Sequence, residues 1–274
     1  MNFTIGFSPC PNDTFIFDAL INNKIDTAGH QFVAVLEDVQ TLNRWAMEPR
    51  LDITKLSYAV LPLVLQHYKV LNSGSALGNG VGPLLISNGM QPETTVEQSL
   101  IAIPGEHTTA HLLFSLKYPK AKNKIFLRYD LIEEFVLAGK GLGVIIHENR
   151  FTYAEKGLKK IIDLGDFWES QMQAPIPLGG IVISRKYDHA LQKEVENLVK
   201  QSIDYAFKNY PELNDYIRIH SQEMNEEVMR KHINLYVNEY SISLGKKGRE
   251  AVLTLVDVYS RLHELKIDTA GVFV

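Results

Sequence analysis

Apolar residues along the chain follow two different patterns of spacing. Short apolar runs predict β-strands, and longer stretches with an apolar residue every three or four positions predict helices. Strands are expected over residues 3–7, 31–36, 53–55, 82–87, 100–103, 124–126, 142–146 and 180–184. Helices are expected over residues 14–22, 39–47, 58–64, 110–118, 131–138, 148–156, 190–209, 211–221, 226–237 and 246–263. The alternation of the two kinds of segment predicts an α/β fold.

Two of the expected strands resemble each other. Residues 82–87 read GPLLIS and residues 179–184 read GGIVIS, and the stretch between them has strand and helix patterns of its own. The simplest interpretation is a discontinuous α/β domain of residues 1–86 plus 185–274 into which a second α/β domain, 87–184, is inserted. The alternative is two ordinary buried strands. A two-lobed chain would hold its ligand in the cleft between the lobes, near residues that follow strands.

The composition of the chain argues against several classes of function. The 274 residues are 45% hydrophobic and carry a net charge of −4, with a pI near 6.1. A protein that binds nucleic acid needs a concentrated basic surface, so no nucleic-acid partner is expected. No stretch approaches the roughly 18 consecutive apolar residues of a membrane span, so no membrane partner is expected either. A single cysteine and an N-terminus without a signal-peptide pattern favour a cytoplasmic protein.

The first constrained loop follows the first expected strand. Residues 8–15 read SPCPNDTF, and the two prolines fix two φ angles. Asn12 and Asp13 offer side-chain acceptors where a helix should begin, and capping is the commonest role of such residues. The alternative is that Asn12 or Asp13 contacts a ligand from a stiff loop.

Two further strand ends carry candidate anion-binding groups. Lys55 and Ser57 follow the strand that begins at residue 53, and they offer a cation and a hydroxyl near a helix start. Thr108 and Thr109 follow the strand that ends at residue 103, again at a helix start. Thr108 and Thr109 therefore predict an anion site.

His107 and His111 are four residues apart, a spacing that could suit a metal. No glutamate lies between them as in a zinc-protease helix, and no third ligand is indicated nearby, so no metal is expected.

The fourth strand end carries His147. Glycine and four apolar residues precede it, which is typical of a buried strand that delivers an imidazole to its carboxyl end. Histidine titrates near neutral pH, which suits a general base. Glu148 and Arg150 begin a charged helix and are expected to be solvated.

Five motifs along the chain resemble one known family. They are residues 8–15 (SPCPNDTF), 55–59 (KLSYA), 105–110 (GEHTTA), 143–148 (GVIIHE) and 235–240 (LYVNEY). In this order they resemble the 1,4-dihydroxy-6-naphthoate synthase family, the MqnD family of the futalosine route to menaquinone. The resemblance implies a fold like that of type II periplasmic binding proteins. It also implies a cofactor-independent carbon–carbon lyase that cleaves cyclic dehypoxanthinyl futalosine, with a carboxylate-bearing substrate.

The same resemblance implies roles for particular residues. His147 is the implied catalytic base, and the segments Lys55-Leu56-Ser57 and Thr108-Thr109 are implied substrate contacts. A separate hypothesis is that residues 8–15 form a rigid wall of the cleft, from which Asn12 or Asp13 contacts the sugar portion.

Two other functions share the expected fold. One is a solute-binding protein for small carboxylates that has no catalytic activity, and the other is the chorismate dehydratase of the same pathway. The sequence also leaves open whether the apolar, tyrosine-bearing C-terminal helices form a homodimer.

Overall fold

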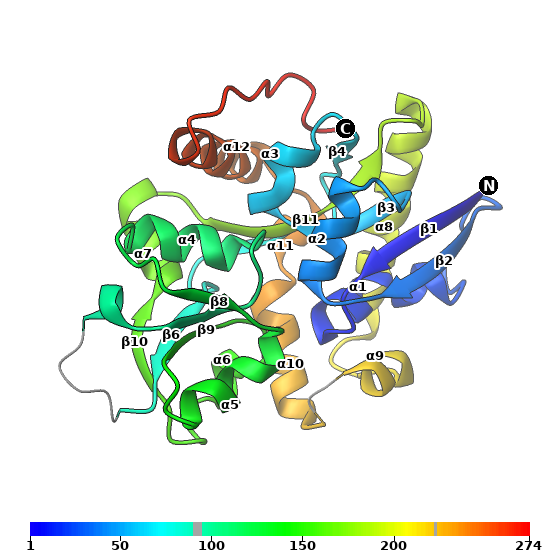
Figure 1. Cartoon of the computed structure of the whole chain (residues 1–274). Helices are drawn as coiled ribbons and strands as arrows, with labels where there is room; N and C mark the ends of the chain where they lie inside the picture. The colour runs from blue at the N-terminus through cyan, green and yellow to red at the C-terminus, as the bar shows by residue number, and fades with distance from the viewer. Residues whose placement is uncertain (90–94, 222–223) are drawn as a thin grey trace. The chain divides into compact units, whose positions relative to one another are not determined.

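The computed structural model describes residues 1–89, 95–221 and 224–274 (Figure 1). The chain divides into two compact units. Unit 1 consists of Met1–Gly78 and Pro177–Val274, and unit 2 of Asn79–Ile176. Each unit is built around its own β-sheet, with helices from the same unit packed on it. The expected α/β class is therefore confirmed.

Unit 1 contains a six-stranded sheet in the order β2-β1-β3-β11-β4, with β5 paired to β11. The strands are β1 (Asn2–Phe7), β2 (Gln31–Leu36), β3 (Ile53–Ser57), β4 (Tyr68–Val70), β5 (Ala76–Gly78) and β11 (Ile176–Ser184). β1 runs parallel to β2 and β3, whereas β11 runs antiparallel to β3 and β4. The carboxyl ends of β1 and β3 therefore lie at the same edge of this sheet.

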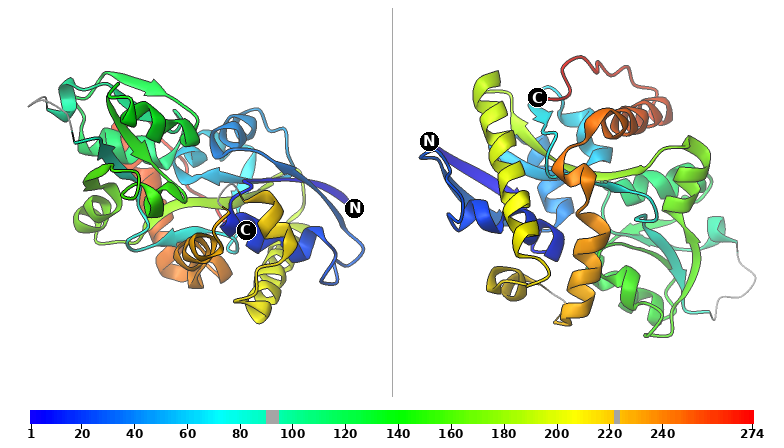
Figure 2. Two further views of the ribbon diagram at one scale, coloured as in Figure 1. Left: turned by 90° about the horizontal axis from the view of Figure 1, so that it is seen from below. Right: turned by 180° about the vertical axis from the view of Figure 1, so that it is seen from behind.

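The helices of unit 1 come from both segments of the chain. They are α1 (Pro11–Ile21), α2 (Val39–Met47), η1 (Tyr58–Val60), α3 (Leu61–Val64), α8 (His189–Asn209), α9 (Asp215–His220), α10 (Glu226–Tyr236), α11 (Glu239–Ile242) and α12 (Gly245–Leu262). α1 packs against α8, α9 and α10. The right-hand view of Figure 2 shows that α8 is a long helix. Apolar side chains of β1, α1 and α8 form one buried core, which fixes the start of α1 relative to the sheet.

Unit 2 contains a five-stranded sheet in the order β10-β6-β9-β7-β8. Its strands are β6 (Leu84–Ser87), β7 (Ile101–Ile103), β8 (Lys124–Phe126), β9 (Leu142–Ile145) and β10 (Lys159–Asp163). Its helices are η2 (Val96–Gln98), α4 (Thr109–Lys117), η3 (Tyr129–Leu131), α5 (Ile132–Leu137), α6 (Asn149–Thr152) and α7 (Leu164–Met172). β7 runs parallel to both β8 and β9, so β7 and β9 end at the same edge. A separate core joins α5 to this sheet.

The unit boundaries fall earlier along the chain than the boundaries expected at 86/87 and 184/185. The GPLLIS segment contains β6, which pairs with β9 and β10 inside unit 2. The GGIVIS segment lies in β11, which pairs with β3 and β4 inside unit 1. Strand pairing assigns each segment to a unit, and sequence similarity between the segments carries no information about pairing.

Several elements differ from expectation. α1 begins at Pro11 rather than at Thr14, because proline is well accommodated in the first helical turn. The segment expected as one helix over 58–64 is the 3₁₀ helix η1 followed by the short α3. Strands β4, β5 and β10 and helices α7 and α11 were not expected. Within residues 1–89, 95–221 and 224–274, no helix is both long and apolar enough to span a membrane.

Candidate active site

The first candidate group lies at the end of β1, in the loop that leads into α1. Ser8 and Asp13 are hydrogen-bonded to each other across this loop. Asp13 is 2% exposed. One of its carboxylate oxygens, Oδ2, accepts hydrogen bonds from the Ser8 backbone N–H at 3.2 Å and from the Ser8 hydroxyl at 2.7 Å. Cys10 occupies the N-cap position of α1, and its side chain makes no capping bond. The expectation that Asn12 and Asp13 cap the helix is therefore wrong, because both lie inside the first turn and Asp13 binds back to the loop.

Lys55 completes this group from the neighbouring strand β3. Its ammonium nitrogen Nζ lies 2.6 Å from Asp13 Oδ1, and the two side chains are 7% and 2% exposed. The contact follows from topology, because the parallel strands β1 and β3 end at the same edge of the sheet. Lys55 therefore offers its cation to a ligand as one half of a buried pair with Asp13.

Ser57 points to the same face of β3 as Lys55, and Leu56 points to the opposite face, because side chains alternate along a strand. The Ser57 hydroxyl accepts a hydrogen bond from Asn43 Nδ2 at 3.1 Å, and the Ser57 backbone N–H donates to Asn43 Oδ1 at 2.8 Å. Ser57 makes no side-chain capping bond to η1. Any Leu56 contact on the Lys55 face would have to come from its backbone.

Asn43 is a residue that the sequence interpretation missed. It is fully buried on α2, where it shares the inward face with Leu42 and Ala46. A polar residue on an otherwise apolar helical stripe was the available signal, since buried polar side chains need a partner. The partner of Asn43 is Ser57, so α2 holds the end of β3 in place.

The second candidate group belongs to unit 2 and begins at the N-terminus of α4. Thr108 is the N-cap residue, and its hydroxyl accepts from the His111 backbone N–H at 3.2 Å and donates to the Gly105 carbonyl at 2.9 Å. Thr108 and Thr109 are each 3% exposed. The helix start expected here is confirmed, and the Thr108 hydroxyl is engaged within it.

His111 packs beside this helix start. Its Nδ1 lies 2.7 Å from the Glu106 carbonyl oxygen, and its Nε2 lies 3.0 Å from Lys124 Nζ. Burial lowers the pKa of His111, the Glu106 carbonyl acts in the opposite direction, and the Lys124 charge adds to the lowering. The net effect keeps the imidazole neutral at physiological pH.

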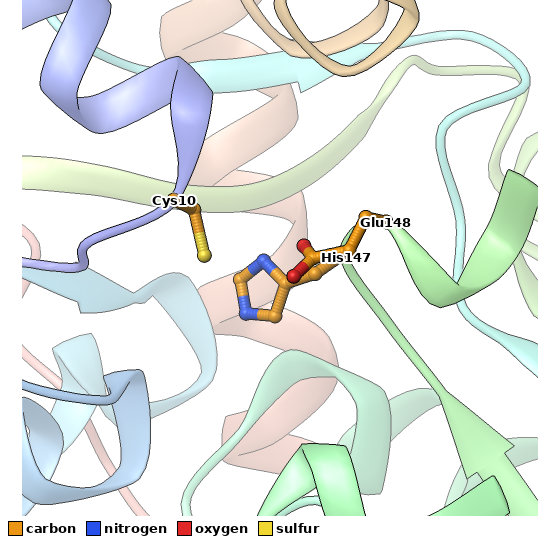
Figure 3. A group of neighbouring side chains, drawn as sticks. All are labelled: Cys10, His147 and Glu148. Atoms are coloured by element: carbon orange, nitrogen blue, oxygen red, sulfur yellow. The ribbon is translucent and has the colours of Figure 1, made fainter. Parts of the chain in front are cut away.

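His147 follows β9 at the same sheet edge as the end of β7. Its backbone is left-handed, with φ of 57°, a conformation that costs a residue other than glycine about 1–3 kcal/mol. The ring meets that of Tyr129 edge-on, with centroids 4.8 Å apart. Figure 3 shows the His147 and Glu148 side chains close together; the third labelled residue, Cys10, belongs to unit 1. The buried strand expected before His147 is confirmed.

Arg150 ties the His147 segment to the rest of unit 2. Its guanidinium donates to the carbonyls of Gly80 (2.8 Å) and Gly82, and it forms an ion pair with Asp163 at 2.7 Å. The Arg150 backbone N–H also donates to the His147 carbonyl at 3.3 Å. The expectation that Arg150 is solvated is wrong, because its side chain is only 16% exposed.

Glu148, which was also expected to be solvated, is 7% exposed, so that expectation is wrong as well.

The two strand ends of unit 2, those of β7 and β9, bring Thr108 and His147 to one edge of one sheet. The unit 1 group of Asn12, Asp13, Lys55 and Ser57 lies at one edge of the other sheet.

Comparisons with known proteins identify the family to which the chain belongs. Residues 3–261 match the family model described as menaquinone biosynthesis. The chain belongs to the menaquinone biosynthesis family. Within this family, a protein of Thermus thermophilus named 1,4-dihydroxy-6-naphthoate synthase is 45% identical over 92% of this chain and 91% of its own length. A protein of Streptomyces coelicolor with the same name is 37% identical over 92% and 90%. The resemblance indicated by the five motifs is confirmed.

Solved structures show which fold the chain shares with known proteins. A protein from Archaeoglobus fulgidus has a TM-score of 0.90 at 29% identity, covering 96% of this chain and 98% of its own. The periplasmic aliphatic sulphonate binding protein of Escherichia coli has a TM-score of 0.68 at 9% identity, covering 100% and 92%. The periplasmic-binding-protein fold expected of this menaquinone biosynthesis family member is thus confirmed, and the second likeness concerns the fold alone.

Proposed function

We propose that the protein converts cyclic dehypoxanthinyl futalosine to 1,4-dihydroxy-6-naphthoate, with His147 as the base. The names of the two relatives support the reaction, since each is close to full length and well above 30% identical. The observation that carries the role of His147 is its strained left-handed backbone at the end of β9. Such strain concentrates at functional sites, where a side chain is held in one position at a cost in stability.

The α4 N-terminus is the proposed site for the substrate carboxylate. The first N–H groups of a helix have no partner within the helix, and they favour an anion. The Thr108 hydroxyl already caps α4, so its proposed role is to fix the helix start, while the backbone N–H groups and Thr109 face the anion. A carboxylate held there would present the substrate to His147, because β7 and β9 end at the same edge.

The unit 1 group takes the remaining part of the substrate in this proposal. Lys55 and Ser57 share one face of β3, and Asn12 and Asp13 adjoin Lys55. Contacts of this kind would hold the sugar-derived portion in a single orientation. Positioning of this kind can contribute much of a rate enhancement without a cofactor.

The proposed chemistry needs a single base. His147 removes a proton next to the substrate ketone, and the resulting electron pair drives cleavage of the bond to the sugar-derived portion. Formation of the aromatic naphthoate ring makes the reaction favourable. A well-placed general base contributes about 10²- to 10⁴-fold to such a step.

The test is incubation of the purified protein with cyclic dehypoxanthinyl futalosine, with detection of the naphthoate chromophore. Release of the chromophore supports the proposal. Tight binding without turnover would refute it and favour the solute-binding alternative. Turnover of chorismate in place of the futalosine derivative would favour the chorismate dehydratase. A cytoplasmic location and a homodimer remain predictions.

A further inference from the structure

The group around Lys55 contains a buried acceptor without a donor. Asn12 is 6% exposed, and its side-chain oxygen Oδ1 has no hydrogen-bond partner. Its side-chain nitrogen Nδ2 donates to Asp13 Oδ1 at 2.8 Å. This contact fixes the orientation of the amide, because the reverse orientation would place two acceptor oxygens against each other. A buried polar atom without a partner destabilises the fold, so it indicates a role outside the fold itself.

Lys55 and Asn12 share a binding partner, the Asp13 carboxylate. Its Nζ lies 2.6 Å from Asp13 Oδ1, the same oxygen that accepts from Asn12. An ammonium group has three N–H donors, and within the described residues Asp13 is the one partner recorded for those of Lys55. A donor on Lys55 and an acceptor on Asn12 are therefore held beside one carboxylate oxygen.

Charge decides which ligand this arrangement fits. The Lys55 ammonium and the Asp13 carboxylate cancel, and Asn12 is neutral. A carboxylate bound here would add a second negative charge beside Asp13. It would also leave Asn12 Oδ1 unpartnered, because an ionised carboxylate only accepts hydrogen bonds. A hydroxyl group both donates and accepts.

We propose that Asn12 and Lys55 form a subsite for a neutral hydroxyl group of a ligand, which donates to Asn12 Oδ1 and accepts from Lys55 Nζ. Within the proposed function, on which this assignment of the ligand rests, the hydroxyl belongs to the sugar-derived portion of the substrate. The subsite then distinguishes the hydroxyl-bearing end of the substrate from the carboxylate end.

The experiment uses two simple probes with the whole protein. Ribitol supplies neutral hydroxyls, and benzoate supplies a carboxylate without hydroxyls. Their affinities are measured by calorimetry or ligand-observed NMR for the wild type and for Asn12→Leu. Asn197→Leu, an exposed site on α8, is the matched control. Loss of one hydrogen bond of about 1.4 kcal/mol corresponds to a tenfold change.

The expected result is that Asn12→Leu weakens ribitol about tenfold and leaves benzoate unchanged. Ribitol and benzoate should also bind to the wild type at the same time, a measurement that does not depend on whether the variant folds. Competition between the two probes, failure of ribitol to bind, or equal weakening of both by Asn12→Leu would overturn the assignment.

A turnover assay with the futalosine derivative distinguishes failure of the hydroxyl subsite from failure of the proposed function. Ribitol binding without turnover of the futalosine derivative would remove the proposed function and leave the hydroxyl subsite. Turnover without ribitol binding would remove the subsite and leave the proposed function.

Discussion

The buried pair of Asp13 and Lys55 makes a quantitative prediction about stability. The substitution Lys55→Met keeps an unbranched side chain of nearly the same length and removes its charge. It leaves a carboxylate that is 2% exposed without a cation. Removing one partner of a buried ion pair typically costs about 3–5 kcal/mol. Ser8 and Asn12 still donate to Asp13, so we expect a loss near the lower end, about 3 kcal/mol.

The assay is urea unfolding at pH 7, followed by far-UV circular dichroism. The free energy of unfolding is compared for the wild type, Lys55→Met, Asp13→Asn and the double variant. The double variant removes both charges, so its loss should be smaller than the sum of the single losses by about 2–3 kcal/mol. Lys200→Met is the matched control. Lys200 pairs with Asp204 on the surface, with side chains 45% and 48% exposed, and such a pair contributes about 1 kcal/mol or less.

Two results would refute the reasoning. Additive losses, within about 0.5 kcal/mol, would mean that the two charges do not interact. Equal losses for Lys55→Met and Lys200→Met would mean that burial does not strengthen the pair at Lys55.

Substitutions at three other residues test the local structure around the sites. Thr108→Val should lower the free energy of unfolding by about 1 kcal/mol through loss of the α4 cap, and Thr108→Ser should restore it; equal stability of the two variants in urea would contradict the cap. Gly180→Ala should lower the melting temperature, because a Cβ there would lie 2.3 Å from the buried Tyr58 hydroxyl oxygen; an unchanged melting temperature would show that β11 can shift. Because the folded pKa of His111 is lowered, its neutral form stabilises the protein above the unfolded value of about 6.5, and this contribution is lost as the pH falls. His111→Gln should therefore flatten the fall in stability between about pH 7 and pH 5, and an unchanged slope in urea titrations would contradict the assignment.

The sequence predicted the elements with a strong apolar pattern. Strands β1, β2 and β8 and helix α2 lie within one residue of the expected positions. β10 was missed because residues 159–163 begin with two lysines and form an exposed edge strand. α7 was missed because it is only nine residues long and has Gly165 in its first turn, which weakens the helical pattern.

The positions of the candidate site residues could be predicted from the sequence, but the contacts between their side chains could not. Each polar group after a strand was visible in the sequence, since strand ends can be read from the apolar pattern. The pairing of Lys55 with Asp13 was not visible, because it depends on β1 and β3 being neighbours in one sheet. The partner of Ser57, Asn43, comes from a helix that is distant along the chain. Long-range contacts of this kind are set by topology, which a single sequence does not reveal.

The central claim, that His147 is the base, is tested most directly by turnover of the futalosine derivative by His147→Asn. Asparagine tolerates the left-handed backbone at this position but has no group that titrates near neutral pH. The control is His189→Ala, at an exposed residue at the start of α8. We predict a folded His147→Asn variant whose kcat falls at least about a hundredfold, while the control keeps wild-type activity. A folded His147→Asn variant with wild-type kcat would contradict the claim.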